Sequence, residues 1–316
     1  MNKLNFVFWG TPDVASETLE ILKSAGFLPS LVVTSPDARS GRKMLLTPPP
    51  VKIWAEKNNI PCIQPEKLGE LETIFTTSSQ AGEPRKAIFQ QKNMRESKNG
   101  LQFDLFIVVA YGKIIPEEII KMPKLASINI HYSLLPRYRG ASPVESAILN
   151  GDTETGVAIQ NMEYKLDSGS IIALEKVPIE RNETAPDLRK RLIRIGGELL
   201  VKILPDFIEG KIKPIPQDES LASVCKKIKK EDGLVDLEKE SPSVLYNKFR
   251  AYVNWPRIFF FHPPTGGGKR IIITDADLID NPLDKARGKQ FIIKKVLPEG
   301  KKEISYEEFL KISISK

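Results

Sequence analysis

The residues with the clearest capacity for chemistry lie at the end of an apolar stretch near the middle of the chain. Asn129 and His131 lie two positions apart in the segment 127–131, which we expect to be a strand. Side chains two positions apart on a strand point to the same face, so the amide and the imidazole can be directed at one reacting atom. A histidine changes its charge near neutral pH, and N–H donors stabilise negative charge that develops on oxygen. The pair therefore favours acyl transfer through a stabilised oxyanion.

A structural role is the alternative for His131, because a single histidine is more often packed or solvated than catalytic. Its position weighs against that role, since the segment ends a strand and enters a loop, where α/β proteins place their sites. The loop carries Arg137, Arg139 and Gly140, which we do not expect in a core. We therefore interpret 127–140 as a candidate site.

The elements that must position this site alternate between strands and helices. Apolar residues predict buried strands over 4–9, 27–34 and 105–110, and a helical pattern runs over 13–23. This alternation predicts an α/β fold with a Rossmann-like, mostly parallel sheet. The turn after the first strand lacks Gly-x-Gly-x-x-Gly, so the sequence does not indicate a dinucleotide cofactor.

The character of the chain changes after a long helical pattern over 185–209. We expect a catalytic domain over 1–205, a linker over 206–216 and a C-terminal domain over 217–316. Short strand-like segments predict that this last domain is a small β-barrel of the oligonucleotide-binding type. They lie at 258–262, 270–274, 290–297 and 302–304, with a hairpin signal at Thr265-Gly266-Gly267-Gly268. The polar, patternless stretch 71–100 is interpreted as an insertion in the catalytic domain.

The composition favours a polyanionic partner and argues against a metal site. The 316 residues carry a net charge of +7 with a pI of about 9.1, as nucleic-acid-binding proteins often do. The two cysteines, Cys62 and Cys225, lack metal-ligand spacing, so we expect free thiols and no bound metal. No apolar stretch approaches the roughly 20 residues of a membrane span, and the first apolar run is too short for a signal peptide. We expect a cytoplasmic, monomeric protein.

Two basic segments are candidates for contact with phosphates. The loop 35–50 carries Arg39, Arg42 and Lys43 ahead of a run of prolines, and it is either a solvated loop or a basic finger. A second run comprises Lys226, Lys227, Lys229 and Lys230. A solvated face is the commoner interpretation of such a charge run.

The candidate site resembles a motif of the folate-dependent formyltransferases. In that motif Asn-x-His is followed by Ser-Leu-Leu-Pro and by Arg-Gly, as it is here from Asn129 to Gly140. Further matches are Gly10-Thr11-Pro12, Val108-Val109-Ala110-Tyr111-Gly112, Leu166-Asp167-Ser168-Gly169, Asp232-Gly233-Leu234-Val235-Asp236, Arg250-Ala251 and Trp255-Pro256. The resemblance covers nearly the whole chain except 71–100. Tyr132, where the family carries a small residue, and Lys165 depart from the pattern.

The resemblance implies catalytic roles for Asn129, His131 and Asp167, with Asp167 orienting His131. By itself, Asp167 would be taken for an Asx-type turn residue. The implied formyl donor is 10-formyltetrahydrofolate. Its expected binding residues are Ser133, Leu134, Leu135, Pro136, Val109, Ala110, Tyr111 and Gly112. The implied acceptor is the amino group of initiator methionyl-tRNA, held by the loop of Arg39, Arg42 and Lys43 and by the C-terminal lysines.

Two other interpretations remain open. The same catalytic residues serve formyl transfer to a small amine, such as glycinamide ribonucleotide or a nucleotide-linked amino sugar. A catalytically silent RNA-binding protein could use the same fold, although it would have no need of Asn129, His131 and Asp167 together. The basic segments favour a tRNA acceptor over the small amines.

Overall fold

The computed structural model describes residues 4–41, 44–69, 71, 75, 96–97, 100–263, 268–280 and 288–314. The chain divides into two compact units. The first unit comprises Met1–Arg139, Gly156–Lys176 and Lys190–Ala222, and the second comprises Gly140–Thr155, Val177–Arg189 and Ser223–Lys316. Most of the predicted insertion 71–100 and part of the hairpin signal Thr265–Gly268 lie outside the described residues.

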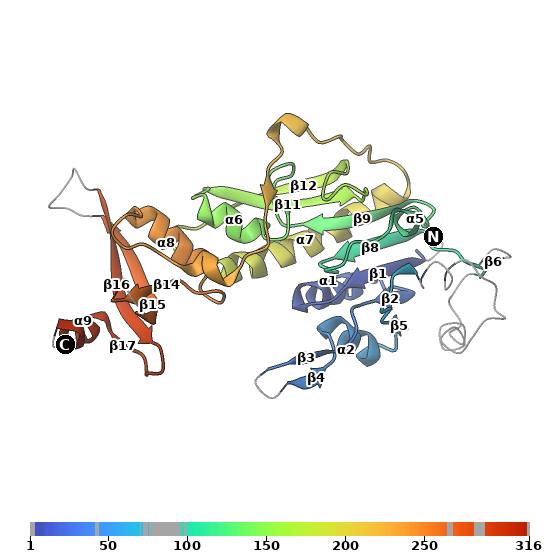
Figure 1. Cartoon of the computed structure of the whole chain (residues 1–316). Coiled ribbons are helices and arrows are strands. Elements are labelled where there is room, and N and C mark those ends of the chain that lie inside the picture. The colour runs from blue at the N-terminus through green and yellow to red at the C-terminus, as the bar shows by residue number, and fades with distance from the viewer. Residues whose placement is uncertain are drawn as a thin grey trace. The chain divides into compact units, whose positions relative to one another are not determined.

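The main sheet has seven strands in the order β12-β11-β9-β8-β1-β2-β5 (Figure 1). Their bounds are β1 (Phe6–Gly10), β2 (Leu31–Val33), β5 (Cys62–Ile63), β8 (Leu105–Val109), β9 (Ala126–His131), β11 (Glu154–Asn161) and β12 (Ile171–Pro178). The strands β5, β2, β1, β8 and β9 pair in parallel, and β11 pairs antiparallel with β9. The predicted mostly parallel α/β sheet is therefore confirmed.

The helices of this α/β part are α1 (Asp13–Ser24), α2 (Pro50–Lys57), α5 (Glu117–Ile120) and α7 (Ala185–Ile208). The long helix α7 has nearly the bounds that the helical periodicity predicts. It packs closely in the first unit, because a Cβ on Gly197 would lie 2.6 Å from the side chain of Ile21 on α1. The neighbouring Gly196 lies against Ile130 of β9, so α7 supports the strand that carries the candidate site.

Buried aromatic rings fill the core beside β1 and β8. The ring centroid of Trp9 lies 5.5 Å from that of Phe106 and 5.3 Å from that of Tyr111. Phe106 also lies 5.8 Å from Phe103, and all four side chains are buried. Such rings bury large apolar areas and fix the strands whose ends form the site.

Short elements flank the main sheet. Within the segment 35–50, which was expected to be a loop, β3 (Ala38–Ser40) pairs antiparallel with β4 (Leu45–Thr47). Further two-residue strands are β6 (Glu96–Ser97), β7 (Gly100–Leu101), β10 (Arg139–Gly140) and β13 (Val224–Cys225). The 3₁₀ turns are η1 (Glu219–Leu221) and η2 (Lys230–Gly233). Both cysteines are free thiols.

The second unit contains an antiparallel sheet in the order β14-β15-β16-β17. Its strands are β14 (Phe259–His262), β15 (Lys269–Asp280), β16 (Lys289–Pro298) and β17 (Ile304–Ser305). They correspond to the four predicted strand segments, which confirms the small C-terminal β domain. Helix α8 (Pro242–Ala251) packs against β15, β16 and α6 (Pro143–Leu149), and α9 (Tyr306–Ile314) packs against β16. Within the described residues, no helix is both long and apolar enough to cross a bilayer.

The aromatic core generates a stability prediction. Replacing Phe106, which is 1% exposed, by alanine leaves a cavity and should lower the free energy of unfolding by about 3–5 kcal/mol. Ile114→Ala is the matched control, because Ile114 is 80% exposed and its truncation opens no cavity. Urea unfolding of both variants measures the difference. Equal midpoints for the two variants would contradict the assignment of Phe106 to the core.

Candidate active site

Strand β9 places Asn129 and His131 at its carboxyl end. In the antiparallel ladder with β11, Gln160 lies opposite Asn129 and Ala158 lies opposite His131. Directly paired residues share a face of a sheet, so Asn129, His131 and Gln160 gather on one side. His131 is buried and Asn129 is half-buried. Among the described residues, the Asn129 side-chain amide has no hydrogen-bond partner, which leaves its N–H groups available to a ligand.

The backbone fixes the proton of His131. Its Nε2 lies 2.8 Å from the carbonyl oxygen of Tyr138, and because a carbonyl can only accept, Nε2 must carry the proton and donate it. The other ring nitrogen, Nδ1, lies 3.6 Å from Oδ2 of Asp167. That separation is longer than a good hydrogen bond but short enough for strong attraction once the ring is charged. Nδ1 is therefore the ring nitrogen that can exchange a proton in the site.

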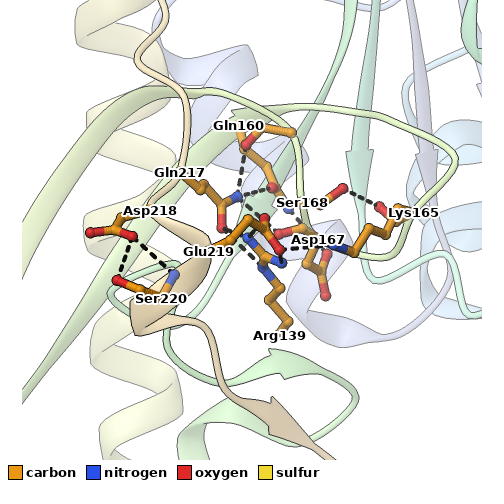
Figure 2. Close-up of polar contacts among 10 residues, drawn as sticks. Arg139, Gln160, Lys165, Asp167, Ser168, Gln217, Asp218, Glu219 and Ser220 are labelled. Atoms are coloured by element: carbon orange, nitrogen blue, oxygen red, sulfur yellow. Dashed lines mark hydrogen bonds and ion pairs between the residues drawn. The ribbon is translucent and has the colours of Figure 1, made fainter.

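Asp167 reaches the site from a tight turn between β11 and β12 (Figure 2). Its backbone adopts a left-handed conformation with φ of 50°, and Ser168 Oγ donates to the Lys165 carbonyl at 2.8 Å. Gly169 is required next, because a Cβ there would lie 1.8 Å from the carbonyl oxygen of Asn161. The sequence Asp-Ser-Gly thus returns the chain sharply enough to bring the carboxylate to His131.

The expectation that Arg139 lies outside the core is wrong. Its side chain is buried, with 4% of the residue exposed. The guanidinium donates to both carboxylate oxygens of Glu219, at 2.7 and 3.1 Å, and to the side-chain oxygen of Gln217. These paired hydrogen bonds make its burial possible. Arg137 is exposed, as expected, and its guanidinium lies 4.9 Å from the centre of the Tyr138 ring.

Glu219 lies at the surface end of this cluster. Hydrogen bonds from Arg139, and then from Lys165 at 2.8 Å, lower the pKa of its carboxyl to about 2. The carboxylate is therefore charged throughout the physiological pH range. Arg139 thus keeps its partner, and its guanidinium keeps its orientation.

The two segments expected to bind folate contribute differently. Ala110 and Gly112 are exposed and have positive φ angles of 47° and 83°. The Tyr111 side chain lies in the aromatic core, where burial raises its pKa to about 12, and its carbonyl accepts from Thr11 Oγ1 at 3.0 Å. Val109 is buried. Only backbone atoms and the small side chain of Ala110 are therefore accessible in this segment.

The second expected folate segment, Ser133–Pro136, is a compact turn. The Ser133 hydroxyl is buried and donates to the Arg137 carbonyl at 2.6 Å, so it is committed within the loop. Leu135 is buried as well, whereas Leu134 and Pro136 are half-buried. The structure brings this turn and Ala110–Gly112 to the same edge, because β8 and β9 are adjacent parallel strands with Val108 paired to Asn129.

Tyr132, which stands where the family motif has a small residue, points away from the His131 imidazole. The Tyr132 ring is buried beside Gly196 of α7, while His131 contacts Asp167. Successive side chains alternate faces at a strand end, which accounts for the separation.

The structure describes only some of the basic residues that were predicted to contact tRNA. Arg39 is exposed on β3, with Nη1 3.4 Å from the Met44 carbonyl, whereas Arg42 and Lys43 lie outside the described residues. The four C-terminal lysines, Lys226, Lys227, Lys229 and Lys230, are all exposed in the second unit. Nowhere in the described ranges do three or more His, Cys, Asp or Glu side chains gather to hold a metal ion.

Sequence reasoning missed two glutamines of the site. Gln160 is buried and donates to Oδ1 of Asp167 at 3.1 Å, and Gln217 contacts Gln160 and the Asp167 turn (Figure 2). Gln217 lies 50 positions beyond Asp167, so no local pattern links them. For Gln160, the only available signal was a polar residue directly after the apolar run Val157–Ile159 of β11.

Comparison with known proteins gives the same family for both halves. The formyl transferase family model matches residues 2–204, and the model of the formyl transferase C-terminal domain matches 227–291. A methionyl-tRNA formyltransferase of Halalkalibacterium halodurans is 37% identical over 288 residues, covering 90% of this chain and 82% of that protein. One of Chloroflexus aurantiacus is 40% identical over 259 residues, covering 82% and 76%.

Solved structures share the fold at lower identity. An N-formyltransferase of Helicobacter canadensis, in complex with folinic acid and dTDP-3-aminofucose, matches with a TM-score of 0.62 and 19% identity, covering 89% of this chain and 90% of that one. A methionyl-tRNA formyltransferase of Clostridium thermocellum matches with a TM-score of 0.55 and 14% identity, covering 93% and 98%. With the family models matching both its N-terminal and C-terminal parts, the chain belongs to the formyl transferase family.

Proposed function

We propose that this protein transfers the formyl group of 10-formyltetrahydrofolate to the methionine amino group of initiator methionyl-tRNA. The observation that carries the chemistry is the convergence of Asn129, His131 and Asp167 at the end of β9, with Nδ1 of His131 3.6 Å from Asp167. The relatives that are 37% and 40% identical are methionyl-tRNA formyltransferases, which supports the choice of acceptor.

The folate co-substrate fits the edge formed by the ends of β8 and β9. Exposed backbone at Ala110 and Gly112 provides N–H and C=O groups for a pterin, and the half-buried Leu134 and Pro136 provide apolar surface. A small number of polar groups on an apolar wall is the usual composition of such a site. The Ser133 hydroxyl, which is committed to Arg137, has no contact with the co-substrate in this proposal.

The reaction joins the methionine nitrogen to the formyl carbon and then breaks the bond from that carbon to N10 of the folate. The attack produces a tetrahedral oxyanion, and the side-chain amide of Asn129 donates to it. The attacking amine loses a proton to Nδ1 of His131, directly or through water, and Asp167 stabilises the resulting imidazolium. The proton returns to N10 as tetrahydrofolate leaves, so the site ends in its starting state.

The tRNA acceptor is supported by charge in both units. Arg39 is exposed in the first unit, and Lys226, Lys227, Lys229 and Lys230 are exposed in the second. Phosphate contacts of this kind supply affinity that falls as salt rises. We propose that the four lysines, here called the lysine run, contact the body of the tRNA. The site at the end of β9 would then receive the end of the tRNA that carries the methionine.

Removing the oxyanion donor should slow the reaction without weakening tRNA binding. Asn129→Ala is expected to lower kcat about 100- to 1000-fold while the Kd for tRNA stays the same. Initial rates with methionyl-tRNA and a binding titration measure the two quantities. Asn58→Ala is the matched control, because it also removes an asparagine amide but at the end of α2 and not on β9. There the Asn58 amide donates to the Trp54 carbonyl. Weakened tRNA binding with a normal kcat in Asn129→Ala would exclude the catalytic role.

Neutralising the lysine run should reduce the salt dependence of tRNA binding. Replacing its four lysines by alanine should weaken binding and lower the slope of log K against log salt by up to about 0.7–0.9 for each phosphate that is no longer neutralised. The matched control replaces four other exposed lysines of the same unit, Lys269, Lys289, Lys301 and Lys302. Equal slopes for the two quadruple variants would show a response to total charge and would overturn the assignment.

A further inference from the structure

We propose that Gln217 is a positioning residue of the transfer reaction. Its amide, oriented by Arg139, holds Gln160 and the Asp167 turn so that the Asp167 carboxylate faces His131. The inference rests on the proposed function, because it explains how the groups of that reaction are kept in place. All five residues belong to the first unit, and Figure 2 shows the cluster except for His131.

The orientation begins at Arg139. Its Nε and Nη2 lie 3.0 and 2.8 Å from the side-chain oxygen of Gln217. A guanidinium can only donate, so the oxygen of the Gln217 amide must face Arg139 and the nitrogen must face the opposite way. Glu219 binds the outer edge of the same guanidinium through two hydrogen bonds, which prevents it from turning.

The nitrogen of Gln217 then faces three acceptors. It lies 3.1 Å from Oε1 of Gln160, 2.9 Å from the Asp167 carbonyl and 2.7 Å from the Gly169 carbonyl. Its two N–H bonds are shared among these oxygens. Gln217 therefore holds the backbone on both sides of Ser168, within the turn whose left-handed residue is Asp167.

The same logic fixes Gln160. Because its Oε1 accepts from Gln217, its Nε2 must point toward Asp167, where it donates to Oδ1 at 3.1 Å. The second carboxylate oxygen, Oδ2, is the one that faces Nδ1 of His131 at 3.6 Å. Gln160 is buried, so water cannot readily replace its amide as the donor. One guanidinium thus sets the direction of each hydrogen bond from Arg139 to Asp167.

The test replaces the amide of Gln217 by a carboxylate. Gln217→Glu keeps an oxygen for Arg139 but removes both N–H donors. The Gln160 amide should then turn to donate to the introduced carboxylate, and its oxygen would come to face Asp167. An acceptor facing a carboxylate favours its protonated form, so the acid limb of the kcat–pH profile should move to higher pH. At neutral pH we expect kcat to fall about 10- to 100-fold with little change in KM for either substrate.

The variants Gln160→Met and Gln217→Met, alone and combined, distinguish an effect of Gln217 that is transmitted through Gln160 from a general loosening of the site. If Gln217 acts through Gln160, the double variant Gln160→Met/Gln217→Met should lose no more kcat than the worse single variant. Losses that multiply would mean independent effects and would overturn the proposal. Asp218→Asn is the matched control, because the Asp218 side chain bonds only Ser220 among the described residues and lies outside this chain of contacts. Melting curves and folate binding verify that each variant is folded.

The outcomes also separate this inference from the proposed function. A wild-type enzyme that transfers no formyl group would overturn the proposed function itself. A wild-type enzyme that does transfer it, together with a Gln217→Glu variant whose kcat and pH profile match the wild type, would overturn only the role of Gln217. A reduced kcat with an unchanged pH profile and unchanged kcat in Gln160→Met would assign Gln217 a purely structural role and would equally overturn the proposal.

Discussion

A single hydrogen bond from His131 Nε2 to the Tyr138 carbonyl determines how the rest of the site can work. It commits one ring nitrogen to the backbone and leaves Nδ1 available for the proposed transfer. Two features follow from that assignment: Asp167 must lie on the Nδ1 side, and the turn that carries it must bend sharply after β11. The carbonyl is available because residues 133–138 fold back on themselves, held by the Ser133 hydroxyl and by a backbone turn. The loop is therefore part of the proposed catalytic arrangement even where its side chains are buried.

The sheet explains why these groups can meet at all. Parallel pairing of β8 with β9 brings two loop segments to one edge, and the antiparallel neighbour β11 supplies Gln160 beside Asn129. Helix α7 and the aromatic core support this region. A site built from the ends of rigid strands holds its donors in place before substrate arrives, which is the condition for electrostatic stabilisation of an oxyanion.

Features that depend on neighbouring residues could be predicted from the sequence, and those that depend on distant partners could not. Strand alternation was sufficient to place Asn129 and His131 on one face, and helical periodicity gave the bounds of α7 closely. Asp167 came from a resemblance, since by spacing alone it is an ordinary turn residue. Arg139 was misjudged because its burial depends on Gln217 and Glu219, which lie 78 and 80 positions further along the chain. Partners so distant leave no periodic signal in the sequence. Only the folded chain shows that the Arg139 guanidinium has hydrogen-bond acceptors where it is buried.

The central claim is tested most directly by a competition between acceptors. The purified protein would receive 10-formyltetrahydrofolate, charged initiator methionyl-tRNA and glycinamide ribonucleotide in one reaction, and both products would be quantified. Our account predicts formylmethionyl-tRNA as the product, with none formed by His131→Ala. Transfer to the small amine alone would keep the chemistry of Asn129, His131 and Asp167 but contradict the tRNA acceptor. Binding of tRNA without transfer to either acceptor would contradict the enzyme itself.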